Sequence, residues 1–280
     1  MKKRIPAAGI AAYALILLIV FFTLFPVFWL LVSAFKPKEE IFTVIPSFMI
    51  KNPTLDNIKW ALSPSSGDFM PFFVNSIVIT VFTIIVTIVL SYFAAYALAR
   101  YKFRGMAVVF GLLMLSQMFQ GPSIMVAWYK MAQFMKIVNT RMVLVLIYCT
   151  ATIPISTVLL SGFVRSIPKE LDEAAMIDGA SKIQILARVI LPLLTPFLVS
   201  VSIYAAIISW NDYQYALILT SSKKASTVQI SLANLMSSMG SQNWGGIMAT
   251  ALIITLPVVV FFAVIQKNLI TGLTRGAVKG

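Results

Sequence analysis

The sequence predicts an all-α, polytopic membrane protein with six transmembrane helices. Of its 280 residues, 60% are hydrophobic and only 11% are charged, whereas charged residues make up about a quarter of an ordinary soluble domain. Apolar runs without any charge recur along the chain, and several exceed the roughly 20 residues that a helix needs to cross a bilayer. The basic residues gather in short clusters beside these runs, as signals of membrane topology do.

The first predicted helix lies within residues 5–35, which carry no charge and follow three basic residues. Val32-Ser33-Ala34 weakly resembles a signal-peptidase site, but the run is longer than the roughly 7 to 15 residues of a signal-peptide core, so we predict a retained helix. Residues 36–68 are polar and contain four prolines. They predict an external segment with short interfacial pieces, so that 1–70 form a first region.

Five more helices complete the prediction, and residues 71–267 form the transmembrane core that contains them. The second helix runs from about Asn75 to Ala99, and the third from about Gly105 to Tyr129. The fourth covers 142–164, and the fifth begins at Pro192. Because residues 237–246 are too polar to span a membrane, the sixth helix is placed at 247–266. Residues 268–280 remain as a carboxyl-terminal tail.

The distribution of lysine and arginine predicts the orientation. With the amino terminus inside, internal segments hold thirteen of the 22 basic residues, and the clusters without acidic neighbours, at 2–4 and 100–104, both lie inside. Six helices then place both termini in the cytoplasm. The loop at 165–191, between the fourth and fifth helices, is also cytoplasmic.

Several function classes are excluded by composition. Cys149 is the only cysteine and the chain has no histidine, which excludes an intrachain disulfide and a Cys/His metal site. No phosphate-binding P-loop is present, and no acid, base or metal cluster predicts an enzyme. The net charge of +13 is spread over membrane-flanking clusters, which argues against nucleic-acid binding.

The 165–191 loop has the local pattern of helix, break and helix. Pro168 suits a first helical position, and Glu170 and Asp172 place negative charge in the first turn, where the helix dipole favours it. Gly179 stands where a left-handed residue would end the helix, and Ser181 can cap a second helix. One face of the first helix carries mostly small residues, which would let another surface approach closely; these residues are Leu171, Ala174, Ala175 and Asp178.

This loop resembles the EAA loop of permease subunits of ATP-binding-cassette (ABC) importers. The resemblance rests on Glu173-Ala174-Ala175, then Gly179 after three residues, Val189 after nine more, and Leu191-Pro192. It implies a type I ABC importer permease fold in which the loop forms coupling helices that dock into a groove on a cytoplasmic ATPase. The alternative is an ordinary amphipathic hairpin. The positions implied in docking are Glu173, Ala174, Ala175, Asp178, Gly179, Ala180, Leu191 and Pro192.

Other stretches are similar to the carbohydrate branch of this family, the MalG type. They are Asn75-Ser76 with 94–100, Trp210-Asn211-Asp212-Tyr213, and the tail at 272–280. In that branch a proline more often stands at position 120, where this chain has Gln120 and places Pro122 two residues later. The resemblance implies that the tail, with Arg275 and Lys279, reaches between the ATPase subunits.

The same resemblance implies a permease subunit of a binding-protein-dependent sugar importer in a bacterial or archaeal cytoplasmic membrane. Its partners would be a second, MalF-type permease, two ABC ATPases, an extracellular solute-binding protein and the lipid bilayer. This chain would bind no cofactor, because the ATPases use the ATP and Mg. The alternatives are an importer of a non-sugar solute and a stand-alone secondary transporter, although the latter would need charges inside the predicted spans, which lack them.

Four residues are candidates for the solute pathway. Gln117 and Gln120 are spaced i, i+3 on the predicted third helix and offer amides to sugar hydroxyls; the alternative is hydrogen bonding to the second permease. Asn211 and Asp212 end the predicted fifth helix, about 30 Å from Pro192. Asp212 would therefore lie at the outer interface, where it is either simply hydrated or part of a gate or binding-protein contact.

Overall fold

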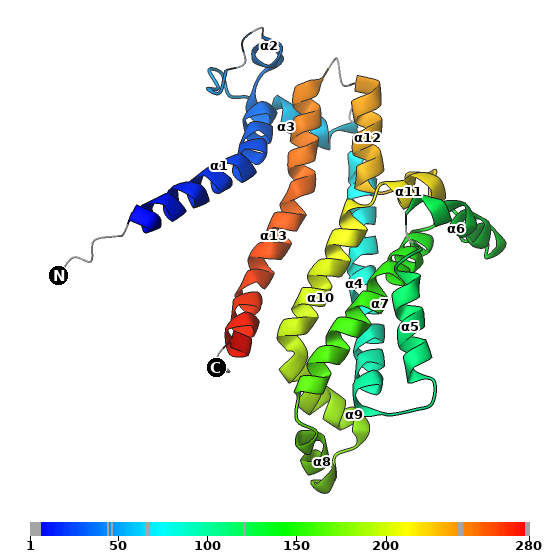
Figure 1. Ribbon diagram of the computed structural model, residues 1–280. Helices are drawn as coiled ribbons and strands as arrows, with labels where there is room; N and C mark the ends of the chain where they lie inside the picture. The colour runs from blue at the N-terminus through cyan, green and yellow to red at the C-terminus, as the bar shows by residue number, and fades with distance from the viewer. Residues whose placement is uncertain are drawn as a thin grey trace. The chain divides into compact units, whose positions relative to one another are not determined.

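The computed structural model describes residues 7–43, 45, 47–64, 68–119, 121–239 and 243–277, without the side chains of 7–11, 122–123, 239 and 266–277. Every regular element in these ranges is a helix, as the sequence predicts (Figure 1). The long helices are α1 (Ala7–Phe35), α4 (Phe69–Arg100), α7 (Arg141–Ser166), α10 (Leu191–Asn211) and α13 (Trp244–Ala277). The shorter ones are α2 (Lys38–Ile41), α3 (Asp56–Leu62), α5 (Met106–Ser116), α6 (Pro122–Phe134), α8 (Glu170–Ile177), α9 (Lys182–Ile185), the π-helical η2 (Leu186–Ile190), α11 (Gln214–Leu219) and α12 (Val228–Met239).

Within the described residues, five helices are long and apolar enough to cross a membrane. They are Ala12–Phe35, Phe69–Arg100, Arg141–Ser166, Lys182–Asn211 and Trp244–Ile265. These match five of the six predicted spans, although the second begins six residues earlier than predicted. The predicted external segment 36–68 contains the short helices α2 and α3.

The third predicted span is not a single helix. α5 ends at Ser116, and α6 begins only at Pro122. Gly121 has a positive φ of 85°, a conformation that favours glycine, and the ring of Pro122 cannot continue a preceding helix but suits the first position of a new one. The Gly121-Pro122 pair therefore breaks an apolar run that hydropathy alone reads as continuous.

The chain divides into two compact units, residues 1–69 with 231–257 and residues 70–230 with 258–280. In the first unit, α3 packs beside the end of α1 around a small core of Ala34, Ala61 and Ala249. The Asn57 amide donates to the carbonyl oxygens of Ala34 and Lys36 at 3.0 and 2.7 Å. These bonds satisfy carbonyls at the end of α1 that have no partner within the helix.

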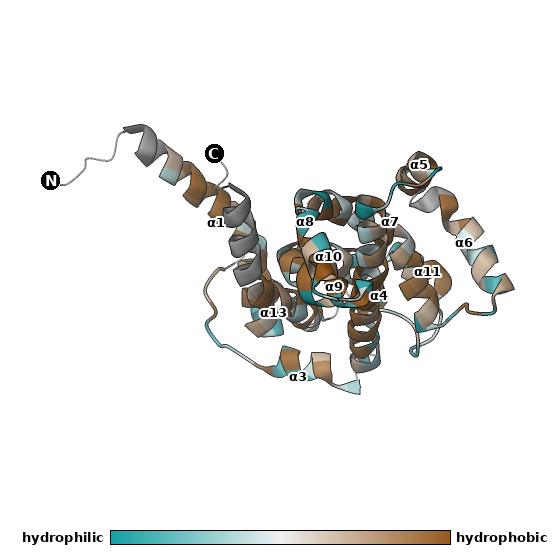
Figure 2. Cartoon of the chain, turned by 90° about the horizontal axis from the view of Figure 1, so that it is seen from below, coloured by the Kyte–Doolittle hydropathy of each residue, from teal (hydrophilic) through white to brown (hydrophobic). Residues whose placement is uncertain are grey.

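In the second unit, α7 packs on α10, α5 on α7 and α6 on α11, and α4 joins α7 and α10 around the buried Ala95, Leu160 and Val201. Hydroxyl groups join the long helices, as in the 2.7 Å hydrogen bond between Thr87 and Thr152. The hairpin of α8 and α9 lies at one end of this unit, and α6 and α11 lie at the other (Figure 1). Seen from the hairpin end, hydrophilic residues gather on α8 and beside α9 (Figure 2).

Candidate functional site

The first helix of the hairpin ends as the sequence predicts. Gly179 has a φ of 81°, and its N–H donates to the carbonyl of Met176 at 3.0 Å. The N–H of Ala180 donates to the carbonyl of Ala175 at 2.9 Å. This pair of bonds is the Schellman motif, in which a left-handed residue closes a helix. The break between α8 and α9 is thus set by a defined backbone geometry.

The second helix begins with the predicted Ser181 cap. The Ser181 hydroxyl accepts from the N–H of Gln184 at 3.4 Å, and the Gln184 side chain accepts from the N–H of Ser181 at 2.7 Å. This reciprocal pair is a capping box, which satisfies two backbone donors that a helix start otherwise leaves open.

We predict that Ser181→Ala weakens the start of α9 by about 1 kcal/mol, because it removes the cap. Amide hydrogen exchange at residues 182–186 should then become about fivefold faster. Ser166→Ala is the matched control, because the Ser166 hydroxyl donates to the Phe163 carbonyl within α7 and caps no helix. Equal exchange in both variants would contradict a capping role.

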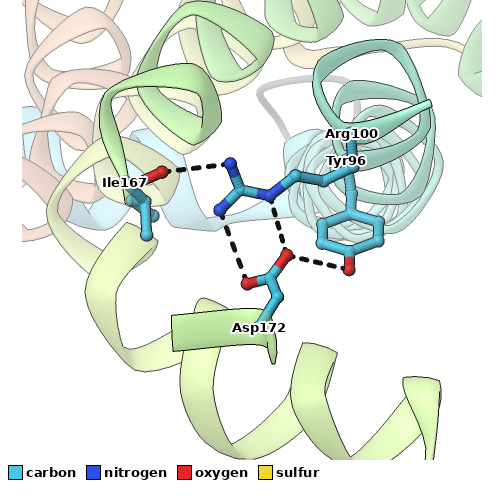
Figure 3. Close-up of polar contacts among 4 residues, drawn as sticks. All are labelled: Tyr96, Arg100, Ile167 and Asp172. Atoms are coloured by element: carbon cyan, nitrogen blue, oxygen red, sulfur yellow. Dashed lines mark hydrogen bonds and ion pairs between the residues drawn. The ribbon is translucent and has the colours of Figure 1, made fainter. Parts of the chain in front are cut away.

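A buried ion pair fixes the hairpin to α4. Arg100 Nε lies 2.7 Å from Asp172 Oδ2, and its Nη2 lies 3.4 Å from Oδ1, so the guanidinium engages both carboxylate oxygens (Figure 3). The Tyr96 hydroxyl donates to the same carboxylate at 3.2 Å, and Arg100 Nη1 donates to the Ile167 carbonyl at 3.0 Å. The ion-paired side chains are only 6% and 7% exposed. Such a buried and bidentate arrangement holds one orientation of α8.

An apolar cluster joins the rest of the hairpin to the bundle. Its buried members are Tyr92, Tyr96, Val164, Ile185, Ile190 and Leu194, and Ala175, Ala180 and Val189 pack against it. The prediction that Ala175 belongs to a small-residue face open to another surface is therefore wrong. Ala175 packs against the apolar cluster, and Asp172 meets Arg100 of α4. Glu173, Ala174, Asp178 and Gly179 are exposed, as are Leu191 and Pro192.

The outer surface of the hairpin carries apolar side chains. Ile177 is 86% exposed and Ile183 is 76% exposed, with Met176 at 50% beside them. We call these three residues the hairpin tip. Met176 and Ile177 lie outside the candidate spans, and Ile183 is the second residue of the span Lys182–Asn211. Exposed apolar groups of this kind are typical of a protein-binding surface.

The hairpin continues without a loop into the next span. α9 passes through the π-helical segment η2 into α10, and Pro192 lacks the N–H that would bond the carbonyl of Arg188 in an α-helix. The Tyr92 hydroxyl donates to the Leu186 carbonyl in this segment at 2.8 Å. The hairpin is therefore continuous with α10 and hydrogen-bonded to α4.

A cavity of about 630 Å³ lies at the opposite end of the second unit. Asn211 and Asp212 line it, together with aromatic side chains that include Trp128, Tyr148 and Tyr215. Asp212 is half-buried and accepts from the Tyr148 hydroxyl at 2.8 Å and the Ala216 N–H at 3.0 Å. Burial raises the pKa of Asp212, although these donors act in the opposite direction.

The structure also bears on the sequence predictions for Asp212, the two glutamines and the two tail residues. Asp212 is not simply hydrated, because α11 begins two residues after it and supplies the N–H groups of Tyr215 and Ala216 to its carboxylate. Gln117 is a turn residue that follows the end of α5, and Gln120 lies outside the described residues. Of the two tail residues, Arg275 has a described backbone in α13 but no described side chain, and Lys279 lies outside the described residues.

The Arg100–Asp172 pair and the hairpin tip are the functional features that sequence reasoning missed. The sequence predicted for Asp172 only a favourable interaction with the helix dipole, and Arg100 served only to predict the membrane orientation. Their one signal in the sequence is that an arginine ends a charge-free run and an acid sits in the next charged loop. The two residues are 72 positions apart in the chain.

A bundle of helices long and apolar enough to cross a membrane, with a docked, apolar-tipped hairpin at one end and a mostly apolar cavity with a few polar groups at the other, suits a membrane transport subunit. The chain belongs to the family described as the binding-protein-dependent transport system inner membrane component, whose model matches residues 72–275. This membership makes it a multi-pass inner-membrane protein and a transport component.

Two relatives match nearly the whole chain. The inner membrane ABC transporter permease protein YcjP of Escherichia coli is 34% identical over 97% of this chain and 96% of its own length. The trehalose/maltose transport system permease protein MalG of Thermococcus litoralis is 35% identical over 92% of each. The fold is shared with a crystal structure of a bacterial ABC transporter involved in the import of the acidic polysaccharide alginate, at a TM-score of 0.81 and 21% identity over 95% of this chain and 98% of that chain.

Proposed function

We propose that this chain forms one half of the translocation pathway of an ATP-driven, binding-protein-dependent carbohydrate importer, and that the loop at 165–191 couples it to an ATPase. The observation that carries the proposal is the hairpin tip. Ile177 and Ile183 are 86% and 76% exposed on a hairpin that the buried Arg100–Asp172 pair holds in one orientation. A surface that is apolar and also rigidly mounted suits a partner that must push on it.

The orientation and partners follow from this role. We place the hairpin and both termini in the cytoplasm, with two ABC ATPases that use ATP and Mg beneath the hairpin. Glu173, Ala174, Asp178 and Gly179 would meet the ATPase groove beside the tip, and Arg275 and Lys279 would reach it through the tail. A second, MalF-type permease would close the pathway, and an extracellular solute-binding protein would deliver the solute. Residues 71–267 would serve as the transmembrane core between the 1–70 region and the 268–280 tail.

A carbohydrate solute is supported by the relatives and by the cavity. The relatives named above include a trehalose/maltose permease. In the cavity, the Trp128 ring and the Tyr215 ring stand near the Asn211 amide and the Asp212 carboxylate. Binding sites with mainly apolar walls and a few placed polar groups are typical for small solutes, and an aromatic face beside an amide suits the two faces of a sugar ring.

Disulfide or bifunctional cross-linking would test the docking role. Cys149 is the only cysteine and is buried, so a Cys149→Ala background leaves no competing thiol. In the assembled complex, Ile177→Cys should cross-link to an ATPase subunit that carries cysteines in its groove, and ATP should change the yield several-fold. Leu217→Cys is the control, because this residue is 52% exposed but belongs to α11 at the other end of the unit. Cross-linking of Leu217→Cys alone, in an intact complex, would refute the proposed docking surface.

A further inference from the structure

A second, smaller pocket lies in the first unit at the carboxyl end of α1. It has a volume of about 220 Å³, and its walls include Trp29, Lys36, Glu40 and Trp244. A cation, a carboxylate and two indole rings therefore face one space. No part of the proposed coupling or pathway role uses these residues.

Lys36 is the unusual member of this pocket. It is only 3% exposed, its ammonium group donates to the Ser47 carbonyl, and it lies 5.6 Å from the centre of the Trp29 ring. Within the described residues, the salt bridges formed are Lys59–Asp56 and Arg100–Asp172, so no described carboxylate pairs with Lys36 at contact distance. An ammonium carries three donors, and Glu40, the carboxylate that shares the pocket, compensates its charge only from beyond salt-bridge distance. The pocket thus offers a buried cation to an anionic group.

Glu40 places the opposite charge in the same pocket. Its two carboxylate oxygens accept from the N–H groups of Lys51 and Asn52 at 3.0 and 2.9 Å. The Lys51 N–H lowers the pKa of Glu40, and the Asn52 N–H and the charge of Lys36 act in the same direction. The carboxylate is thus fixed in place and ionised, and a ligand that fits both residues carries a negative and a positive group.

The two tryptophans of the pocket stand at ends of candidate membrane spans. Trp29 stands in the last two turns of α1, and Trp244 is the first residue of α13, both at ends of candidate spans. Tryptophan is enriched at this depth, where its ring meets the lipid headgroups. A series of rings leads from Trp29 through Phe48 and Phe25 to Phe21, with neighbouring centroids 5.6, 6.1 and 5.9 Å apart. Phe21 and Phe48 are 63% and 57% exposed, so an acyl chain can lie against them.

We propose that this pocket binds the headgroup of phosphatidylethanolamine, with the phosphate at Lys36, the ammonium at Glu40 and an acyl chain along the ring series. This zwitterion compensates both charges and supplies N–H donors to the carboxylate. Phosphatidylglycerol would pair with Lys36 but has no cation for Glu40, and phosphatidylcholine has a cation without an N–H. A neutral sugar could stack on the indoles but would bring no charge to either Lys36 or Glu40.

Lipid retention by the intact importer complex would test the pocket. The complex is exchanged into detergent that contains equal amounts of phosphatidylethanolamine, phosphatidylglycerol and phosphatidylcholine, and bound lipid is counted by native mass spectrometry. We expect Lys36→Met to reduce the retained phosphatidylethanolamine at this site about tenfold or more, because truncating one partner of a buried charge pair weakens binding by at least that factor. Lys38→Met is the matched control, because Lys38 is exposed and lies two positions after Lys36. This variant should retain as much phosphatidylethanolamine as the wild type.

A second variant keeps the test decisive if Lys36→Met fails to fold. Glu40→Gln retains an acceptor for the backbone but removes the negative charge, so lipid preference should shift from phosphatidylethanolamine towards phosphatidylglycerol. Lys36→Arg should preserve binding. The proposal is overturned if Lys36→Met and Lys38→Met retain lipid equally, if Glu40→Gln leaves the preference unchanged, or if added maltotriose occupies the site in place of lipid.

Discussion

Asp172→Ala should destabilise the chain by about 3–5 kcal/mol, because it leaves the guanidinium of Arg100 buried without its counter-charge. The side chain of Arg100 is 6% exposed, so water cannot replace the lost carboxylate. The hairpin would also lose its fixed orientation on α4, and solute uptake by the assembled complex should fall by about tenfold or more. Thermal unfolding of the purified chain and uptake into proteoliposomes measure the two effects.

Two further variants isolate the buried pair. Asp56→Ala removes the partner of Lys59 in an exposed ion pair. The side chain of Lys59 is 75% exposed and that of Asp56 is 81% exposed, so the free energy of unfolding should change by at most about 1 kcal/mol. The double variant Arg100→Met/Asp172→Leu removes both charges and should recover much of the stability. It should not recover uptake, because the directional bonds to Tyr96 and Ile167 are gone. If Asp172→Ala lowers the free energy of unfolding no more than Asp56→Ala does, the Arg100–Asp172 pair does not hold the hairpin.

Gly179→Val should uncouple ATP hydrolysis from uptake. The φ of Gly179 is 81°, and a Cβ there would meet no other atom within 4 Å, so any effect comes from the backbone and not from a clash. A left-handed conformation costs a non-glycine residue about 1–2 kcal/mol, and a β-branched residue tolerates it least. The Schellman closure of α8 would open and the hairpin tip would shift. The measured quantity is the number of ATP molecules hydrolysed per solute imported.

Gly162 provides the matched control for this experiment. A Cβ at Gly162 also meets nothing within 4 Å, but Gly162 has ordinary helical geometry inside α7. Gly162→Ala should therefore stabilise the chain slightly, while Gly179→Ala weakens coupling. The number of ATP molecules hydrolysed per solute imported should be intermediate in Gly179→Asn, between the values of the wild type and of Gly179→Ala, because asparagine tolerates the left-handed region. Unchanged uptake and assembly in Gly179→Val would contradict the role of the break.

Local signals in the sequence were sufficient for much of the fold and for the shape of the hairpin. The spans follow from apolar length, and the turn at Gly179 and the cap at Ser181 follow from the conformational preferences of single residues. Hydropathy failed at Gly121-Pro122, because a backbone break does not change the apolar character of a run. The inward orientation of Ala175 and the pairing of Asp172 with Arg100 depend on how α8 docks against α4, which the periodicity of one helix cannot specify. The bonds from Tyr148 and α11 to Asp212 are likewise tertiary.

The π-helical segment η2 between the hairpin and α10 has a consequence for how the chain tolerates length changes. Successive residues of an α-helix are turned by about 100° about its axis, and a π-helical turn holds one residue more than an α-helical turn. Removing one residue between Leu186 and Ile190 would restore ordinary winding and leave the hairpin close to its present direction, whereas removing one residue from the α-helical part of α10 would turn everything before it by about 100°. The segment Leu186–Ile190 can therefore lose one residue with less change in the direction of the hairpin than the α-helical turns that follow it.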